Sequence, residues 1–162
     1  MSHTLYLFSV FFHILASALW IGGMIFLITA LIPAIKKNPD KVNLLYNISI
    51  RFRTAGWIAL IILIITGWFQ LYYRGAEFSA DYFINNSFGK IALSKIAVAL
   101  TILIISAIHD FKIGIRAMEE WKINPSGEKT MRLRNSSRIL GKINFLLTLI
   151  AVALGVLLSR GL

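Results

Sequence analysis

Three ionisable side chains, His13, Lys95 and His109, lie within or at the edge of long apolar stretches of this sequence. An ionisable group near the centre of a bilayer costs on the order of 2–3 kcal/mol, so its presence there is a reason to expect a function. Imidazole nitrogens are common ligands of haem iron and of other metals. We therefore take the two histidines as candidate metal ligands, with the Lys95 amine as a third.

The composition indicates that lipid is the solvent for much of the chain. Hydrophobic residues make up 57% of the 162 residues and charged residues only 15%, whereas soluble domains have about 25% charged residues. Four apolar runs are each near or above the roughly 18 residues that cross ~30 Å of hydrocarbon as a helix. We therefore expect one all-α domain, an integral membrane four-helix up-down bundle over residues 1–162, with spans at about 5–35, 54–74, 89–112 and 139–160.

The net charge of +10 is distributed unevenly along the chain. Thirteen of the 17 basic residues lie between runs one and two or between runs three and four: Lys36, Lys37, Lys41, Arg51, Arg53, Lys112, Arg116, Lys122, Lys129, Arg132, Arg134, Arg138 and Lys142. The positive-inside rule then places both termini outside and both basic stretches in the cytoplasm, at the inner membrane of a prokaryote. We expect anionic lipid headgroups of the bilayer, and not nucleic acid, to be the partners of this charge.

The connections contain local start and stop signals. Pro39-Asp40 predicts a helix start, and Asn124-Pro125-Ser126-Gly127 predicts a break between two cytoplasmic helix extensions. The outer segment 74–90 is turn-rich, so we expect a loop or a short interfacial helix. Aromatic residues near it predict a belt at the outer interface: Trp68, Tyr72, Tyr73, Tyr82 and Phe83.

The first helix places four residues on one face by i, i+3, i+4, i+7 spacing: His13, Ala16, Ser17 and Trp20. His13 lies roughly 12 Å into the helix from the outer side, and Lys95 lies at a similar depth on the third span. Thr66 and Gln70 approach that level on the second span. We predict a ligand pocket formed by His13, Ser17, Trp20, Gly23 and Lys95. Two alternatives stay open: the histidine only bonds a neighbouring helix, and the lysine extends to the outer headgroups.

His109 begins a second candidate cluster near the cytoplasmic boundary. It shares one stripe of the third helix with Lys95, Ile102 and Ser106, and it lies at about the level of Arg51, Arg53 and Asn144. A histidine near arginines suits a cofactor with carboxylates, such as the propionates of haem. The alternative is an interfacial cluster in which Asp110 pairs with the cations. His13 and His109 should be about 18 Å apart, so we expect two separate sites and not one bis-histidine site.

Several motifs spread over nearly the whole chain together resemble a known family. They are His13, Trp20, Gly22-Gly23, Phe26 and Pro33 in the first span, then RFRTAGW (51–57), Thr66-Gly67, GKIALSKIAVAL (89–100) and LGKINFLLTLIAVALGVLLSRG (140–161). This set resembles the membrane domain of the copper-resistance protein D family. The resemblance implies a four-helix membrane fold and a part in copper uptake or tolerance.

The pattern of His13, Trp20, the glycine pair and the third-span Lys95 is also similar to the four-helix bacterial protoporphyrinogen oxidase, which carries haem. That resemblance implies activity-related roles for His13 and Lys95, with His109 as a looser match. The chain departs from the oxidase after the glycines, where FLITALIPAIKK stands, and in the fourth span, where Asn144-Phe145 replaces an Asn-Glu pair.

These observations lead to one expectation and three alternatives. We expect a haem b-binding membrane redox protein with one or two haems, partnered by a quinone/quinol or a porphyrin, and compatible with a homo-oligomer. An oxidoreductase acting on quinol, an oxygen species or a porphyrinogen fits the same site. The alternatives are a copper transport or resistance protein, a protoporphyrinogen oxidase-like enzyme and a cofactor-free structural bundle. Cu(I) favours Cys or clustered Met, whereas this chain has no Cys and its four methionines lie at different levels.

Overall fold

The computed structural model describes residues 3–160 and contains four long apolar helical segments. They cover His3–Ile35, Lys41–Tyr73, Ser87–Ile123 and Glu128–Arg160, and each is long and apolar enough to cross a membrane. A helix of 33 residues is about 50 Å long, which exceeds the ~30 Å of hydrocarbon in a bilayer. The all-α bundle of four membrane-crossing helices is therefore confirmed, and so is the extension of the helices beyond the hydrocarbon.

Two of the four segments contain a single π-helical turn. In chain order the elements are α1 (His3–Phe26), η1 (Leu27–Leu31), α2 (Ile32–Ile35), α3 (Lys41–Tyr73), α4 (Ala80–Asn85), α5 (Ser87–Ile108), η2 (His109–Ile113), α6 (Gly114–Ile123) and α7 (Glu128–Arg160). Hydrophobic periodicity predicted neither π-helical turn. One of them, η2, begins at His109, and π-helical turns inside α-helices occur frequently at functional sites.

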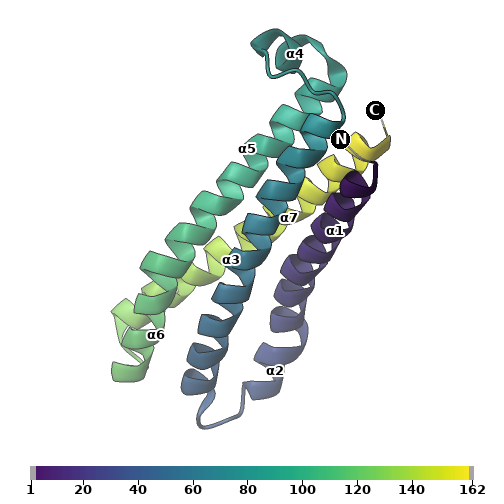
Figure 1. Ribbon diagram of the computed structural model, residues 1–162. Coiled ribbons are helices and arrows are strands. Elements are labelled where there is room, and N and C mark those ends of the chain that lie inside the picture. The colour runs from purple at the N-terminus through teal and green to yellow at the C-terminus, as the bar shows by residue number, and fades with distance from the viewer. Residues whose placement is uncertain (1–2, 161–162) are drawn as a thin grey trace.

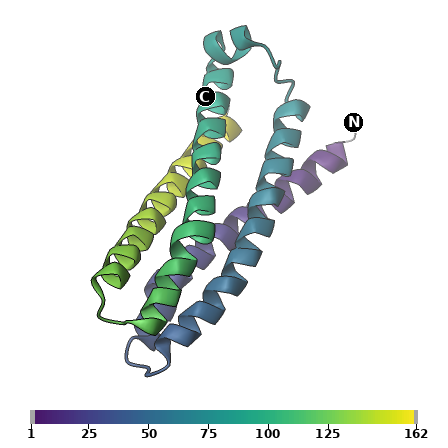
Figure 2. The same ribbon diagram turned by 90° about the vertical axis from the view of Figure 1, so that its left-hand side faces the viewer.

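The up-down course of the chain places both ends of the described chain and α4 at one end of the bundle (Figures 1 and 2). We call this the α4 end. The two short connections, between α2 and α3 and between α6 and α7, lie at the opposite end (Figure 1). We call that the basic end, because it carries the two basic stretches of the sequence. The charge bias predicts that the basic end faces the cytoplasm.

The predicted start and stop signals lie where the helices begin and end. The α3 helix starts at Lys41, directly after Pro39-Asp40, and α6 and α7 are separated by residues 124–127. The outer segment contains the short helix α4, whose N-cap Ser79 accepts a hydrogen bond from the Tyr82 backbone N–H. Gly75 has a φ of 73° just after α3, a conformation that glycine adopts without strain.

The bundle is built from two antiparallel pairs, α1 with α3 and α5–α6 with α7. Contacts along the first pair keep one register from end to end. The Tyr73 hydroxyl oxygen lies 3.4 Å from Nδ1 of His3. Further along, Thr66 contacts His13 and Phe52 packs against Gly23. A side chain on Gly23 would overlap the Phe52 ring, so the close approach of α1 to α3 requires glycine at that position.

A core cluster of three buried side chains, Trp20, Leu60 and Ile102, joins the two pairs near the middle of the bundle. Trp20 fits because α3 has glycine at position 56, where an added Cβ would lie only 2.7 Å from the indole Cζ3. The outward faces of the four helices are apolar, and large side chains such as Ile14, Ile65, Ile104 and Leu146 are exposed there. Such an outer surface requires lipid around it, because water would not solvate it.

Candidate cofactor site

The centre of the candidate site is the side chain of His13, which projects from α1 toward α3. Its Nδ1 lies 2.7 Å from the hydroxyl oxygen of Thr66. The same hydroxyl donates to the Ile62 carbonyl oxygen at 2.6 Å, and a carbonyl oxygen only accepts hydrogen bonds. The single hydroxyl proton is therefore used, so Nδ1 of His13 must be the donor to Thr66. Neutral His13 then carries its lone pair on Nε2.

That lone pair is the main chemical feature of the site. Within residues 3–160, no side chain or backbone group forms a hydrogen bond with Nε2 of His13. A histidine whose Nδ1–H is held by an oxygen and whose Nε2 is unbonded has the arrangement typical of a metal ligand. The same contact also fits the alternative from the sequence analysis, in which the histidine bonds a neighbouring helix. The two descriptions are compatible because each uses a different ring nitrogen.

Further polar contacts fix α1 against α3 around His13. The Ser9 hydroxyl donates to the Thr66 carbonyl oxygen at 3.2 Å, and the Gln70 amide donates to the Ser9 carbonyl oxygen at 3.4 Å. The predicted site residue Ser17 donates to the backbone carbonyl of His13 at 2.8 Å, so its hydroxyl is used within α1. These bonds restrict the position of the helix face that carries the imidazole.

Lys95 lies half-buried on α5, with its ammonium group against α7. A Cβ added to Gly155 would lie 3.2 Å from Nζ, so the glycine leaves the space that the ammonium group occupies. Lys95 is within electrostatic range of both His13 and Arg74. Neither ion pair in the described part of the chain includes Lys95. A half-buried cation without a carboxylate partner, placed near His13, is suited to an anionic ligand.

Trp20 and Asn144, both predicted site residues, lie in the core of the bundle and are linked through α7. The indole N–H of Trp20 donates to the Thr148 hydroxyl at 3.2 Å, which donates to the backbone carbonyl of Asn144 at 2.8 Å. The Asn144 amide donates to the Ser106 hydroxyl at 3.0 Å. Its oxygen Oδ1 is buried and has no partner among the described residues. These side chains connect α1, α5 and α7 at a level that is closer to the basic end than His13 is.

His109 forms a separate cluster toward the basic end. Its Nδ1 lies 2.8 Å from Asp110 Oδ1, and its Nε2 lies 3.0 Å from the Ser137 hydroxyl on α7. The other carboxylate oxygen of Asp110 accepts from the Trp57 indole at 3.1 Å, and Arg53 donates to the Asp110 carbonyl at 3.3 Å. Both ring nitrogens of His109 are therefore engaged, and a metal on Nε2 would have to displace Ser137.

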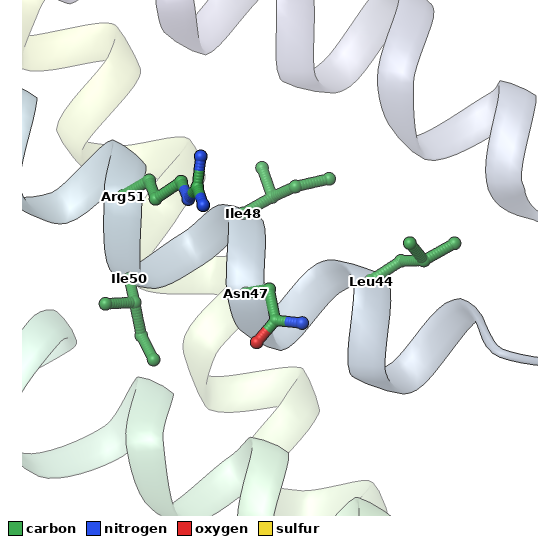
Figure 3. A pocket seen from close by; sticks show the side chains of 5 residues that line it. All are labelled: Leu44, Asn47, Ile48, Ile50 and Arg51. Atoms are coloured by element: carbon green, nitrogen blue, oxygen red, sulfur yellow. The ribbon is translucent and has the colours of Figure 1, made fainter.

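The two arginines predicted beside His109 are placed differently by the structure. Arg53 reaches the His109 cluster through Asp110 and lies over the Phe111 ring, 5.7 Å from its centroid. Arg51 is exposed and lines a shallow hollow on α3 together with Leu44, Asn47, Ile48 and Ile50 (Figure 3). The structure therefore brings His109 and Arg53 together but leaves Arg51 outside that cluster.

Sequence reasoning missed several residues that contact the predicted ones. Trp57, Ser137 and Thr148 hold Asp110, His109 and Trp20, respectively. A signal for the last two was present in the sequence, because Ser137, Gly141, Asn144 and Thr148 are all small or polar at helical spacing on one face of α7. In residues 3–160, no group of three or more His, Cys, Asp or Glu side chains is placed to hold a metal ion.

Comparisons with known proteins give one similar sequence. The chain is 28% identical over 153 residues to an uncharacterized protein of Aquifex aeolicus (strain VF5), and the match covers 93% of each chain. No family model matches the chain. No solved structure matches it either. The similarity therefore extends over nearly the full length of both proteins and carries no statement about activity.

Proposed function

We propose that this protein is a haem b-binding membrane redox protein in which Nε2 of His13 is an axial ligand. The observation that carries the proposal is the hydrogen bond from His13 to Thr66. It fixes the tautomer with the proton on Nδ1, so the Nε2 lone pair is available to iron. Metal-ligating histidines in proteins almost always donate their other ring N–H to an oxygen.

The charges around His13 also fit this cofactor. A haem carries two propionate carboxylates, and Lys95 lies within electrostatic range of both His13 and Arg74. Arg74 is held in place by its bonds to Tyr6 and to the Leu158 carbonyl, whereas Lys95 has no carboxylate partner in the described chain. Lys95 would pair with a haem carboxylate or serve as a second ligand to the iron. When bound, haem supplies one-electron redox chemistry that side chains do not.

The residues favour one haem at His13 over two. His109 has both ring nitrogens engaged, whereas His13 has one nitrogen without a partner. The resemblance of the sequence to the haem-carrying protoporphyrinogen oxidase points to the same pair, His13 and Lys95. Electron donors that dissolve in the bilayer, such as a quinol, suit a site with this apolar surround.

The experiment is to purify the protein in mild detergent and to measure its visible spectrum, its haem content by pyridine haemochrome and its metals by mass spectrometry. We expect a Soret band, reducible α and β bands and about one haem per chain. A colourless, iron-free preparation that also fails to take up added haemin would reject the proposal. Stoichiometric copper in that preparation would support the copper alternative in its place.

A further inference from the structure

The hollow on α3 carries two polar side chains without partners. Its lining residues are Leu44, Asn47, Ile48, Ile50 and Arg51 (Figure 3). Within residues 3–160, no hydrogen bond, ion pair or ring contact involves the Arg51 guanidinium, and no hydrogen bond involves the Asn47 side-chain amide. Arg51 and Asn47 are one helical turn apart, so they lie on the same face of α3. Both are exposed.

Several neighbouring cations of the basic end differ from Arg51 in having a partner within the protein. Lys122 lies over the Tyr46 ring, Arg134 lies over the Trp121 ring, and Lys129 pairs with Glu120. Arg53 donates to the Asp110 carbonyl oxygen. Arg51 is therefore free to bind a group that is not part of the described chain. Since no carboxylate lines the hollow, that group should be an anion.

The position of Arg51 along α3 matches the depth of lipid phosphates. The apolar run of this helix begins at Ala55, four residues and about 6 Å beyond Arg51. The headgroup layer between hydrocarbon and water is roughly 5–7 Å thick on each side of a bilayer. The guanidinium group therefore lies within or close to this layer, on the leaflet at the basic end.

An exposed apolar track leads from this level into the membrane. Ile50, Ile58, Ile61 and Ile65 are spaced by eight, three and four residues, which places them on one face of α3. Their exposed fractions are 36%, 54%, 52% and 63%. Ile50 itself lines the hollow with Arg51, so the series of exposed isoleucines begins beside the cationic group.

We propose that this surface binds one anionic phospholipid of the leaflet at the basic end. Arg51 and Asn47 hold the phosphate, and one acyl chain lies along the isoleucine track of α3. A zwitterionic lipid fits less well because its ammonium group would meet an end of the protein rich in Lys and Arg, with no carboxylate in the hollow. The proposal gives Arg51 a partner other than a haem propionate and does not depend on haem binding.

The test is native mass spectrometry of the purified protein titrated with phosphatidylglycerol or with phosphatidylcholine of the same acyl chains. We expect the wild-type protein to retain one phosphatidylglycerol in preference to phosphatidylcholine. Arg51→Gln should weaken the phosphatidylglycerol complex by about tenfold, because a charge-assisted and bidentate contact is lost. Arg51→Lys keeps the positive charge but loses the planar set of guanidinium N–H donors, so it should give an intermediate affinity for phosphatidylglycerol.

The matched control is Arg132→Gln, which removes the same charge from an exposed position on α7 at the same end. We expect this variant to keep the wild-type preference. Equal weakening by both substitutions would overturn the proposal in favour of diffuse attraction between the basic end and anionic lipids. It would also be overturned if Arg51→Gln kept the wild-type affinity, or if both lipids bound equally. Helical content measured by circular dichroism shows that each variant is folded.

Discussion

At the scale of single residues, the two ring nitrogens of His13 have different surroundings. His13 donates through Nδ1 to Thr66, and this leaves Nε2 to bind a ligand. His109 is also a histidine on a membrane-length helix, yet both of its ring nitrogens are engaged. The sequence alone therefore did not show which histidine has an unbonded ring nitrogen. That difference depends on the side chains that the neighbouring helices place beside each imidazole.

Thr66→Val tests the bond that orients His13. The substitution removes the acceptor of the Nδ1 proton while keeping the side-chain volume, so the imidazole loses its fixed orientation. We expect haem affinity to fall by about 10- to 100-fold, which is the usual effect of removing the hydrogen-bond partner of a ligating histidine. Haem titration followed by absorbance measures it. Thr54→Val is the control, because Thr54 bonds only a carbonyl of its own helix. Equal losses in both variants would speak against the role of Thr66.

Gly155→Ala tests the placement of Lys95. The added methyl group would lie 3.2 Å from Nζ, so the flexible lysine must move its ammonium group away from α7. We expect little change in thermal stability but a several-fold change in haem affinity, on the order of 1 kcal/mol or less. Gly141→Ala serves as the control because nothing lies within 4 Å of its added methyl group. Identical haem affinities for the two variants would show that the position of the Lys95 ammonium group does not affect haem binding.

At the scale of elements, the sequence contained the helices and most of their ends but not their register. Pro39-Asp40 and residues 124–127 are local signals, and the helices start and stop there. The π-helical turn at His109 was not predicted, since hydrophobic periodicity does not distinguish it from an α-helix. The pairing of His13 with Thr66, and of Trp20 with Thr148, depends on how α1 lies against α3 and α7. The hydrophobic pattern of a single sequence does not specify that register.

Gly56→Ala tests the close packing of α1 on α3. An added Cβ would lie 2.7 Å from the Trp20 ring, and a buried indole cannot move aside easily. Overpacking of this kind costs about 1–3 kcal/mol, so the melting temperature in detergent should fall by several degrees. Gly22→Ala has nothing within 4 Å of the new methyl group and should leave the melting temperature unchanged or slightly raised. A stable Gly56→Ala variant would be inconsistent with this packing.

At the scale of the whole molecule, the arrangement is a bundle with a different kind of surface at each level. The α4 end carries both ends of the described chain (Figure 1). The middle exposes apolar side chains, and the basic end carries most of the positive charge. The structure shows four helices that are long and apolar enough to cross a membrane, whereas the direction in which the bundle sits in that membrane follows from the charge bias alone.

Labelling of single cysteines tests that direction. The chain has no cysteine, so Ser126→Cys and Glu77→Cys each introduce one thiol, at the basic end and at the α4 end respectively. With a membrane-impermeant maleimide on intact cells, we expect Glu77→Cys to be labelled and Ser126→Cys to react only after the membrane is permeabilised. The reverse pattern would place the basic end outside.

Chemical rescue of a His13 variant tests whether this imidazole binds the haem iron. His13→Gly removes the imidazole and leaves a space beside Thr66 that free imidazole can enter. We predict that the purified variant loses its haem spectrum, and that haemin added together with imidazole restores the reduced α band at the wild-type position whereas haemin alone does not. His109→Gly should keep the spectrum without imidazole. A His13→Gly variant with wild-type haem content and an unchanged spectrum would contradict the assignment of His13 as the axial ligand.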